Sequence, residues 1–222
     1  RPEETYTLRF TVLMQRIFEQ FMGRFLRGER PVLRLGQTLF LIKEILATPE
    51  SSPWADYVSL GALWQAAGER AGEPLIRLEF LSPTAFSFGQ RPWGRLVQPL
   101  PEARLVFGSL ARTWRAFGIP GIVPEPRAVE AYAEENVAIQ RLEGLETHML
   151  HYGRYPQLGF VGRVTFRVMD RGPESAAWRH TLHALAAYAF YAGVGYKTAM
   201  GMGQCRQCPN GCGDQQADDS LE

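Results

Sequence analysis

The sequence contains very little lysine. Lysine and arginine together make up 24 of the 222 residues, and only Lys43 and Lys197 are lysines. The formal net charge is +1, so the molecule as a whole produces no field that attracts nucleic acid, and any polyanion site must be local. No apolar run reaches the roughly 18 residues of a membrane-spanning helix, and there is no signal peptide. We therefore expect a cytoplasmic protein with no membrane partner.

Cysteine is equally scarce and is confined to one short segment, with thiols at Cys205, Cys208 and Cys212. A fold stapled by disulfides would distribute its cysteines along the chain, so their confinement also favours a reducing compartment. The spacing resembles that of metal-binding thiols, but zinc would need a fourth ligand. The alternative is a tail with incidental cysteines, and we expect no metal and no other cofactor.

The first part of the chain lacks an initiating methionine and enters a structured pattern at once. Tyr6, Leu8, Phe10 and Val12 alternate with polar residues, a period that predicts a strand over residues 5–12. We expect a helix over residues 14–27, strands over 32–46, a loop over 48–59 and a short helix over 60–71. Residues 72–74 are the predicted domain boundary, and the N-terminal domain is expected to be incomplete at its start.

The second part predicts a regular order of elements. Strands are expected over residues 75–80, 137–151, 158–169 and 200–206, with helices over 105–117 and 175–191. The segments 90–101 and 118–126 are rich in proline and are expected to be loops. Strand, helix, strand, strand, helix, strand is the ferredoxin-like arrangement, an antiparallel sheet with helices on one face. The predicted domains are therefore 1–73 and 74–206, followed by a flexible tail or linker over 207–222.

Such a sheet leaves one face open. Arg163, Thr165 and Arg167 share that face of the strand over residues 158–169, where the two arginines could bind phosphates or stacked bases. The alternative is a solvated sheet face with ordinary charges.

Glycines are concentrated between the last predicted helix and the last strand, at Gly193, Gly195, Gly201 and Gly203. Backbone amides in such a loop can form an anion-binding nest, and Lys197 and Thr198 add a charge and a hydroxyl. A nucleotide-binding P-loop or a dinucleotide fingerprint would require a strand before the loop and a helix after it. Since the order here is reversed, both are excluded, and a phosphodiester cradle and an ordinary glycine-rich turn remain.

The segment over residues 192–204 resembles the C-terminal signature of the RAMP superfamily, and more narrowly that of the CRISPR precursor-RNA endoribonucleases of the Cas-six type. Residues 78–86, 99–107 and 159–166 resemble the same family in the same order, so the resemblance covers about residues 5–206. It implies an α+β protein with tandem ferredoxin-like (RRM-like) domains, the first incomplete at its N-terminus. It also implies CRISPR repeat RNA as the partner.

The resemblance further implies metal-independent cleavage, in which the 2′-hydroxyl of the RNA attacks the adjacent phosphorus and leaves a 2′,3′-cyclic phosphate. The family's usual base is a histidine in a part of the first domain that this sequence does not contain, so the catalytic residue is unknown and His151 is a weak candidate. The RNA-binding candidates are Gly193, Gly195, Tyr196, Lys197, Thr198, Gly201, Gly203, Arg163 and Arg167. We also expect Gly195→Asp to weaken RNA binding without unfolding the protein.

Three alternatives remain open on the sequence. The protein could be a RAMP subunit that binds RNA without cutting it, working beside other CRISPR-associated proteins. It could be the RNA-processing part of a larger adaptation protein, since some relatives are fused to a reverse transcriptase and integrase. It could also be a protein-interaction module with the same fold.

Overall fold

The computed structural model describes residues 4–27, 32–152 and 155–208. The chain divides into two compact units, Arg1–Ser59 and Leu60–Glu222.

The first unit contains one helix and a small hairpin. Helix α1 spans Gln15–Leu26, and strands β1 (Val32–Leu35) and β2 (Thr38–Leu41) pair antiparallel. Gly36 in the turn between them has φ +62°, a backbone conformation that glycine adopts at little cost. The ring of Phe18 stacks on that of Tyr57 with the centroids 5.4 Å apart. The predicted helix and the following loop are confirmed, whereas the predicted strands end at Leu41 and do not extend to residue 46.

The strand predicted over residues 5–12 is wrong, because residues 4–14 have no regular secondary structure. The Phe10 side chain stays exposed, although its ring meets that of Phe21 in α1 edge-on, with 5.4 Å between centroids. An alternating pattern predicts which side chains share a face, but a strand also needs a neighbouring strand to pair its backbone groups. The pattern alone contains no information about that neighbour.

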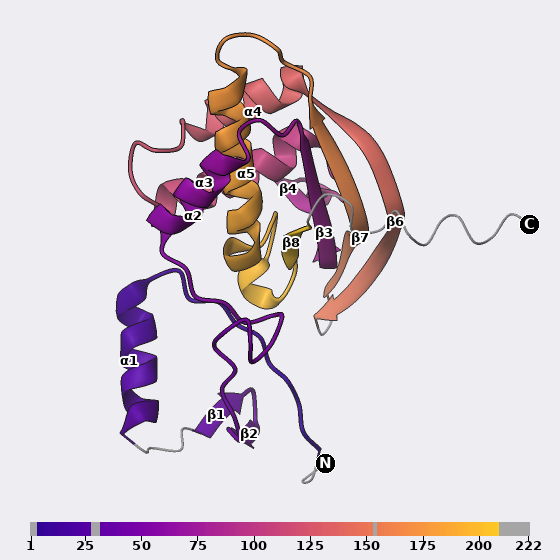
Figure 1. Ribbon diagram of the computed structural model, residues 1–222. Coiled ribbons are helices and arrows are strands. Elements are labelled where there is room, and N and C mark those ends of the chain that lie inside the picture. The colour runs from indigo at the N-terminus through magenta and orange to yellow at the C-terminus, as the bar shows by residue number, and fades with distance from the viewer. Residues whose placement is uncertain (1–3, 28–31, 153–154, 209–222) are drawn as a thin grey trace, which may run out of the picture. The chain divides into compact units, whose positions relative to one another are not determined.

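The second unit is built on a four-stranded antiparallel sheet with helices on one face (Figure 1). Its strands are β3 (Leu75–Thr84), β6 (Val137–Tyr152), β7 (Tyr155–Val168) and β8 (Cys205–Cys208), in the order β6-β7-β3-β8. Helix α3 (Ala103–Phe117) connects β3 to β6, and helix α5 (Ser175–Ala192) connects β7 to β8. The second unit therefore has the predicted ferredoxin-like topology.

The core of this unit lies between the sheet and α3 and α5. In β7, Phe166 is fully buried and its ring meets Phe107 of α3 edge-on, with centroids 5.4 Å apart. Trp114 of α3 meets Tyr188 of α5 in the same way at 5.0 Å. The fully buried aliphatic side chains of this core include Ile76, Leu78, Leu110, Leu182 and Leu185.

No helix within the described residues is long and apolar enough to cross a membrane.

Helix α2 (Leu60–Glu69) groups with the second unit, because it packs on α5. Trp64 of α2 lies over the imidazole of His180, with the centroids 3.9 Å apart. His180 Nε2 donates a hydrogen bond to the carbonyl oxygen of Trp64 at 2.8 Å. The boundary between the two units therefore lies after Ser59, so α2 belongs to the second unit. The sequence predicts this boundary at residues 72–74, after α2.

Two predicted loops contain regular structure. Residues predicted as a loop over 90–101 include parts of β4 (Phe86–Arg91) and β5 (Gly94–Gln98), which form a hairpin. The proline-rich segment before β6 leads into helix α4 (Pro126–Asn136), which begins at a proline. Proline is well tolerated in the first helical turn, where its missing N–H would have no intrahelical partner. The predicted last strand, in contrast, is shorter, since Thr198–Met200 form a 3-10 turn before β8.

Candidate nucleic-acid interface

Residues 193–203, which we name the glycine loop, form a compact turn between α5 and β8. Gly193 ends α5, with φ +69° and its amide donating to the carbonyl oxygen of Ala189. The loop then closes on itself, because the Val194 amide donates to the Gly203 carbonyl oxygen at 2.8 Å. Val194 and Met202 are buried at the base of the loop, whereas Met200 is half exposed at its outer end. The buried side chains therefore fix the loop to the body of the second unit.

Two of its glycines are required by close backbone packing. Gly203 has φ +72°, and a Cβ there would overlap the carbonyl oxygen of Val194. Gly195 has φ +87°, and a Cβ there would overlap the carbonyl oxygen of Ala85. Gly201, in contrast, has φ +88° but open space around its Cα. The expectation that Gly195→Asp leaves the fold intact is therefore wrong on geometry, because any side chain there must displace the β3–β4 connection.

The glycine amides do not form an open anion nest. Those of Gly193, Gly195, Gly201 and Gly203 donate within the protein, to Ala189 O, Ser109 Oγ, Thr198 O and Pro83 O respectively. An amide that already donates in this way has no hydrogen left for a phosphate. The side chains of the loop, and not its glycine amides, are therefore the groups that can bind a polyanion. The glycines mainly allow the loop to pack closely.

Cationic groups meet at Tyr196. Lys197 Nζ lies 5.3 Å from the centre of the Tyr196 ring, and Arg95 Cζ of β5 lies at the same distance. Cations within about 6 Å of a tyrosine face are attracted to it. Lys197 is also the only non-glycine residue at positive φ within the described ranges, at +58°. This left-handed backbone places its side chain beside Tyr196, so one ring holds two positive charges of the second unit.

Arg95 is the functional candidate that the sequence analysis missed. It lies in the β4–β5 hairpin, and the hairpin root is tied to the loop by the Tyr196 amide, which donates to the Ala85 carbonyl oxygen at 2.8 Å. The hairpin is hard to predict because its register shifts between Ser87 and Gln90, which breaks the alternating pattern. The available signal was the spacing of Arg91 and Arg95 around a Pro-Trp-Gly turn.

The open sheet face carries a second basic cluster, in which one carboxylate lies between two arginines. Glu79 of β3 is in register with Arg163 of β7 and with Arg206 of β8. Arg163 Nε donates to Glu79 at 3.0 Å, and Arg206 Nε donates to its other oxygen at 2.6 Å. Burial opposes ionisation of Glu79, but the hydrogen bonds and charges of the two arginines outweigh it and lower the pKa of this carboxyl.

The predicted RNA-binding residues therefore belong to two places within the second unit. Tyr196, Lys197 and Thr198 lie in the glycine loop, beside the hairpin. Arg163 and Arg167 lie on the open sheet face, as the strand pattern predicts, and Arg167 donates to the amide oxygen of Gln140 at 3.4 Å. The charge of Arg163 is partly neutralised by Glu79.

The histidines lie apart from the loop. His151 is exposed on β6, in register with Pro156 of β7, whereas the loop bonds to the end of β3. Since β7 lies between β6 and β3, His151 is displaced from the loop across the sheet. His183 is fully buried: its Nε2 donates to the Glu73 carbonyl oxygen, and its Nδ1 accepts from Gln207 Nε2. His180 and His183 thus both contact the segment before Pro74, through Trp64 and Glu73.

The three-cysteine metal hypothesis finds no geometric support. Cys205 is in register with Phe80 and Cys208 with Arg77, so their side chains point to opposite faces of the sheet. Burial raises the pKa of the Cys205 thiol well above its ordinary value, which disfavours the thiolate that a metal requires. Across residues 4–27, 32–152 and 155–208, no cluster of three or more potential metal ligands occurs. Cys212 and the predicted tail after Cys208 lie outside the described residues.

The topology and the loop together define the class of the second unit, a ferredoxin-like α+β unit with a glycine-rich loop between its last helix and last strand. The chain belongs to the CRISPR-associated endoribonuclease Cas6 family, whose sequence model matches residues 78–205. That match begins in β3 and ends at the start of β8, so it includes the hairpin, the open sheet face and the glycine loop.

Individual relatives agree with this assignment. A CRISPR-associated endoribonuclease Cas6 of Mycobacterium tuberculosis is 34% identical over 138 residues, which are 60% of this chain and 39% of that protein. The chain is thus similar to about two fifths of the curated relative's length. Among solved structures, the product complex of Cas6 (TTHB231) has a TM-score of 0.76 and 28% identity, covering 94% of this chain and 79% of that one. The product complex of Cas6 (TTHA0078) has a TM-score of 0.66 and 31% identity, covering 89% and 77%.

Proposed function

We propose that this protein binds CRISPR repeat RNA and cleaves it as an endoribonuclease that matures CRISPR RNA. The observation that carries the proposal is the pair of cations at Tyr196, in the glycine loop of a Cas6 family member. Two charges on one aromatic ring suit a polymer that presents a phosphate beside every base. The solved Cas6 relatives include product complexes, which supports the same choice of ligand.

The proposed reaction needs no metal. The 2′-oxygen of one nucleotide attacks the adjacent phosphorus, its proton goes to a general base, and the bond from phosphorus to the 5′-oxygen breaks as that oxygen takes a proton. The products are a 2′,3′-cyclic phosphate and a 5′-hydroxyl. Lys197 and Arg95 would stabilise the extra negative charge on the phosphorane. Since β6 carries His151 away from the loop, we assign the loop to RNA binding and charge stabilisation rather than to proton abstraction.

The test is cleavage of labelled repeat RNA by the full chain in EDTA, with an RNA carrying one 2′-deoxy nucleotide at the cleaved position as control. We expect a single cut, a 3′ end from which phosphatase releases phosphate only after acid has opened the cyclic phosphate, and no cut in the control. Cleavage of the 2′-deoxy RNA, or cleavage that requires a divalent ion, would contradict the proposed mechanism.

A second function, RNA binding without cleavage, is favoured by one observation, the distance across the sheet between His151 and the loop. The same experiment separates the two functions. Tight binding of the repeat without any product in EDTA would replace the endoribonuclease by an RNA-binding subunit. Absence of binding to repeat RNA would exclude both.

A further inference from the structure

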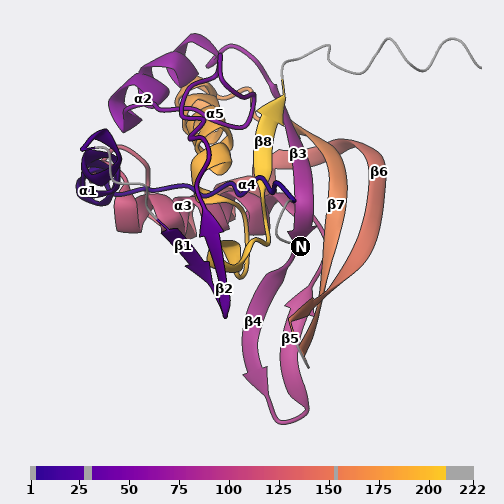
Figure 2. The same cartoon turned by 90° about the horizontal axis from the view of Figure 1, so that it is seen from below.

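The β4–β5 hairpin extends as a two-stranded ribbon beyond the end of β3 (Figure 2). Its strands pair from Phe86↔Gln98 at the root to Arg91↔Gly94 at the tip, so only Pro92 and Trp93 form the turn. Gly94 has φ +134° and Gly89, in the irregular part of β4, has φ +88°. These two glycines let the ribbon bend and close, and the tight turn fixes where its tip residues point.

The tip carries a large aromatic side chain in solvent. Trp93 is 70% exposed, a higher exposed fraction than that of any other large hydrophobic residue of the second unit within the described ranges. A tryptophan buries more apolar area than most side chains when it finds a partner. Because Trp93 is exposed at the end of the ribbon, its apolar area does not stabilise the fold. This exposure indicates that the tip is a surface available to a ligand.

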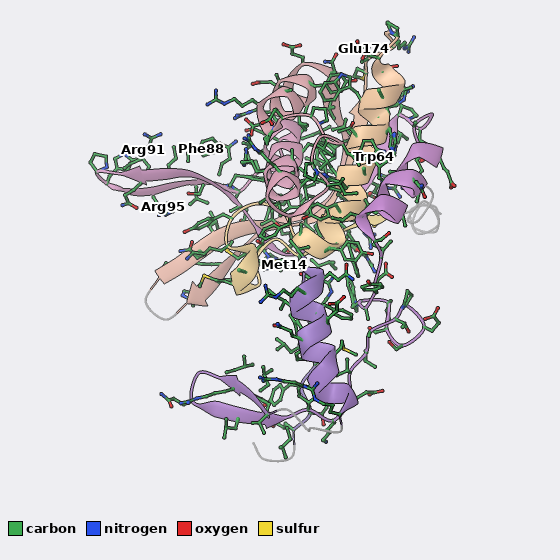
Figure 3. All side chains as sticks on the ribbon, turned by 90° about the vertical axis from the view of Figure 1, so that its left-hand side faces the viewer. Met14, Trp64, Phe88, Arg91, Arg95 and Glu174 are labelled. Atoms are coloured by element: carbon green, nitrogen blue, oxygen red, sulfur yellow. The ribbon has the colours of Figure 1, made fainter. Side chains whose placement is uncertain are left out.

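Arginines flank the tip on both faces of the ribbon. Arg91 and Arg95 point to opposite sides of the hairpin, and Phe88 points to the side of Arg91 (Figure 3). The Arg95 guanidinium is held by a hydrogen bond to Ser87 Oγ at 3.2 Å and lies near the Tyr196 ring. Lys197 and Arg95 thus lie at Tyr196, and Arg95 belongs to the hairpin whose turn carries Trp93.

We propose that Trp93 stacks on an unpaired base of the bound RNA, while Arg91 and Arg95 bind the phosphates on either side of that base. This proposal rests on the proposed function and assigns to the hairpin tip a positioning role for one nucleotide. Alternating aromatic and guanidinium groups match the alternation of base and phosphate along a single strand. A purely apolar tip would instead favour a protein partner, and the two arginines argue for the polyanion.

The test measures binding of repeat RNA by Trp93→Ala, Trp93→Phe and a control, Phe117→Ala, which removes an exposed aromatic at the end of α3. Since one base stacked on an aromatic is worth about 1–3 kcal/mol, we expect Trp93→Ala to weaken binding by about 5- to 150-fold. Trp93→Phe should recover most of the loss, and Phe117→Ala should bind like the wild type. A melting curve of each variant establishes that the protein is folded.

A second readout locates the base. Replacing repeat nucleotides one at a time by the fluorescent base 2-aminopurine should reveal one position at which wild-type protein quenches the fluorescence and Trp93→Ala does not. Equal affinity of Trp93→Ala and wild type, or no position that depends on Trp93, overturns the proposal while leaving the proposed function intact. If Trp93→Ala instead loses a protein partner and keeps its RNA affinity, the tip is a protein-docking surface and the proposal is wrong. If the wild type does not bind repeat RNA, the proposed function itself fails.

Discussion

At the scale of single residues, the glycine loop depends on contacts that no side chain permits. We expect Gly203→Ala to lower the free energy of unfolding by about 3 kcal/mol or more. A left-handed backbone costs an alanine roughly 1–2 kcal/mol, and the added Cβ would also overlap the carbonyl oxygen of Val194. Chemical denaturation of the wild type and the variant measures this difference.

Gly201→Ala is the matched control, because Gly201 has a similar φ but nothing within 4 Å of the added Cβ. Gly201→Ala should lower the free energy of unfolding only by the cost of placing alanine in a left-handed backbone conformation, roughly 1–2 kcal/mol. Equal losses at the two positions would mean that the backbone conformation, and not the packing of the loop, requires glycine.

His183 predicts a dependence of stability on pH. Burial lowers its pKa from the ordinary value of 6.5, although the hydrogen bond to Glu73 partly opposes the shift. Below about pH 6.5 the unfolded chain therefore binds a proton that the folded protein resists, and the folded state loses up to about 1.4 kcal/mol for each pH unit. We expect the wild type to be destabilised between pH 7 and pH 5.

His183→Gln removes this titration while keeping a side-chain amide that can donate to Glu73. Denaturation with urea at pH 7 and at pH 5 should show a smaller loss for the variant than for the wild type. An equal loss in both proteins would mean that groups other than His183 account for the acid sensitivity between pH 7 and pH 5.

At the scale of elements, α2 is an integral part of the second unit. We expect Trp64→Ala to destabilise the protein by about 2–4 kcal/mol, because Trp64 stacks on His180 and lies 6.4 Å from the Trp114 ring. Trp93→Ala removes the same kind of side chain from an exposed position and should change stability by less than about 0.5 kcal/mol. Thermal unfolding of both variants tests the comparison, and similar melting temperatures would contradict the packing of α2 on α5.

Elements with strong periodicity could be predicted from the sequence, and elements with irregular backbone could not. Helices α3 and α5 repeat apolar residues at helical spacing, and Leu105, Leu110 and Leu182 on these apolar faces are buried. The β4–β5 hairpin was missed because its register shift breaks the alternation of β4. Helix α4 escapes prediction because the prolines leading into it are typical of a loop, although Pro126 begins the helix.

The candidate site could be predicted only in part, for the same physical reason. The glycine loop stands out as a local composition, and Lys197 within it is conspicuous because lysine is rare. Arg95 of β5 is distant from Tyr196 in the sequence, and only the folded chain brings the two side chains together. The amides of Gly195, Tyr196 and Gly203 likewise donate to Ser109, Ala85 and Pro83, respectively, and no local pattern connects these acceptors to the loop.

At the scale of the whole molecule, charge is nearly balanced, with a net value of +1. Many cations are paired along the surface: Arg112 with Glu130 and Arg115 with Glu125 join α3 to the segment of α4. Such exposed pairs contribute little to stability but cancel the field of the arginines. RNA affinity is therefore expected to come from local clusters and not from the charge of the molecule as a whole.

The most direct measurement of the central claim is the affinity of repeat RNA for the wild type and for two lysine variants across a series of salt concentrations. If the cations at Tyr196 bind the RNA backbone, Lys197→Ala should weaken binding at every salt concentration and reduce the slope of log affinity against log salt by about 0.7. Lys43→Ala removes the other lysine, which donates to Thr5 Oγ1 in the first unit, and should leave both quantities unchanged. Identical affinities and slopes for Lys197→Ala and the wild type would contradict the assignment of the glycine loop to RNA.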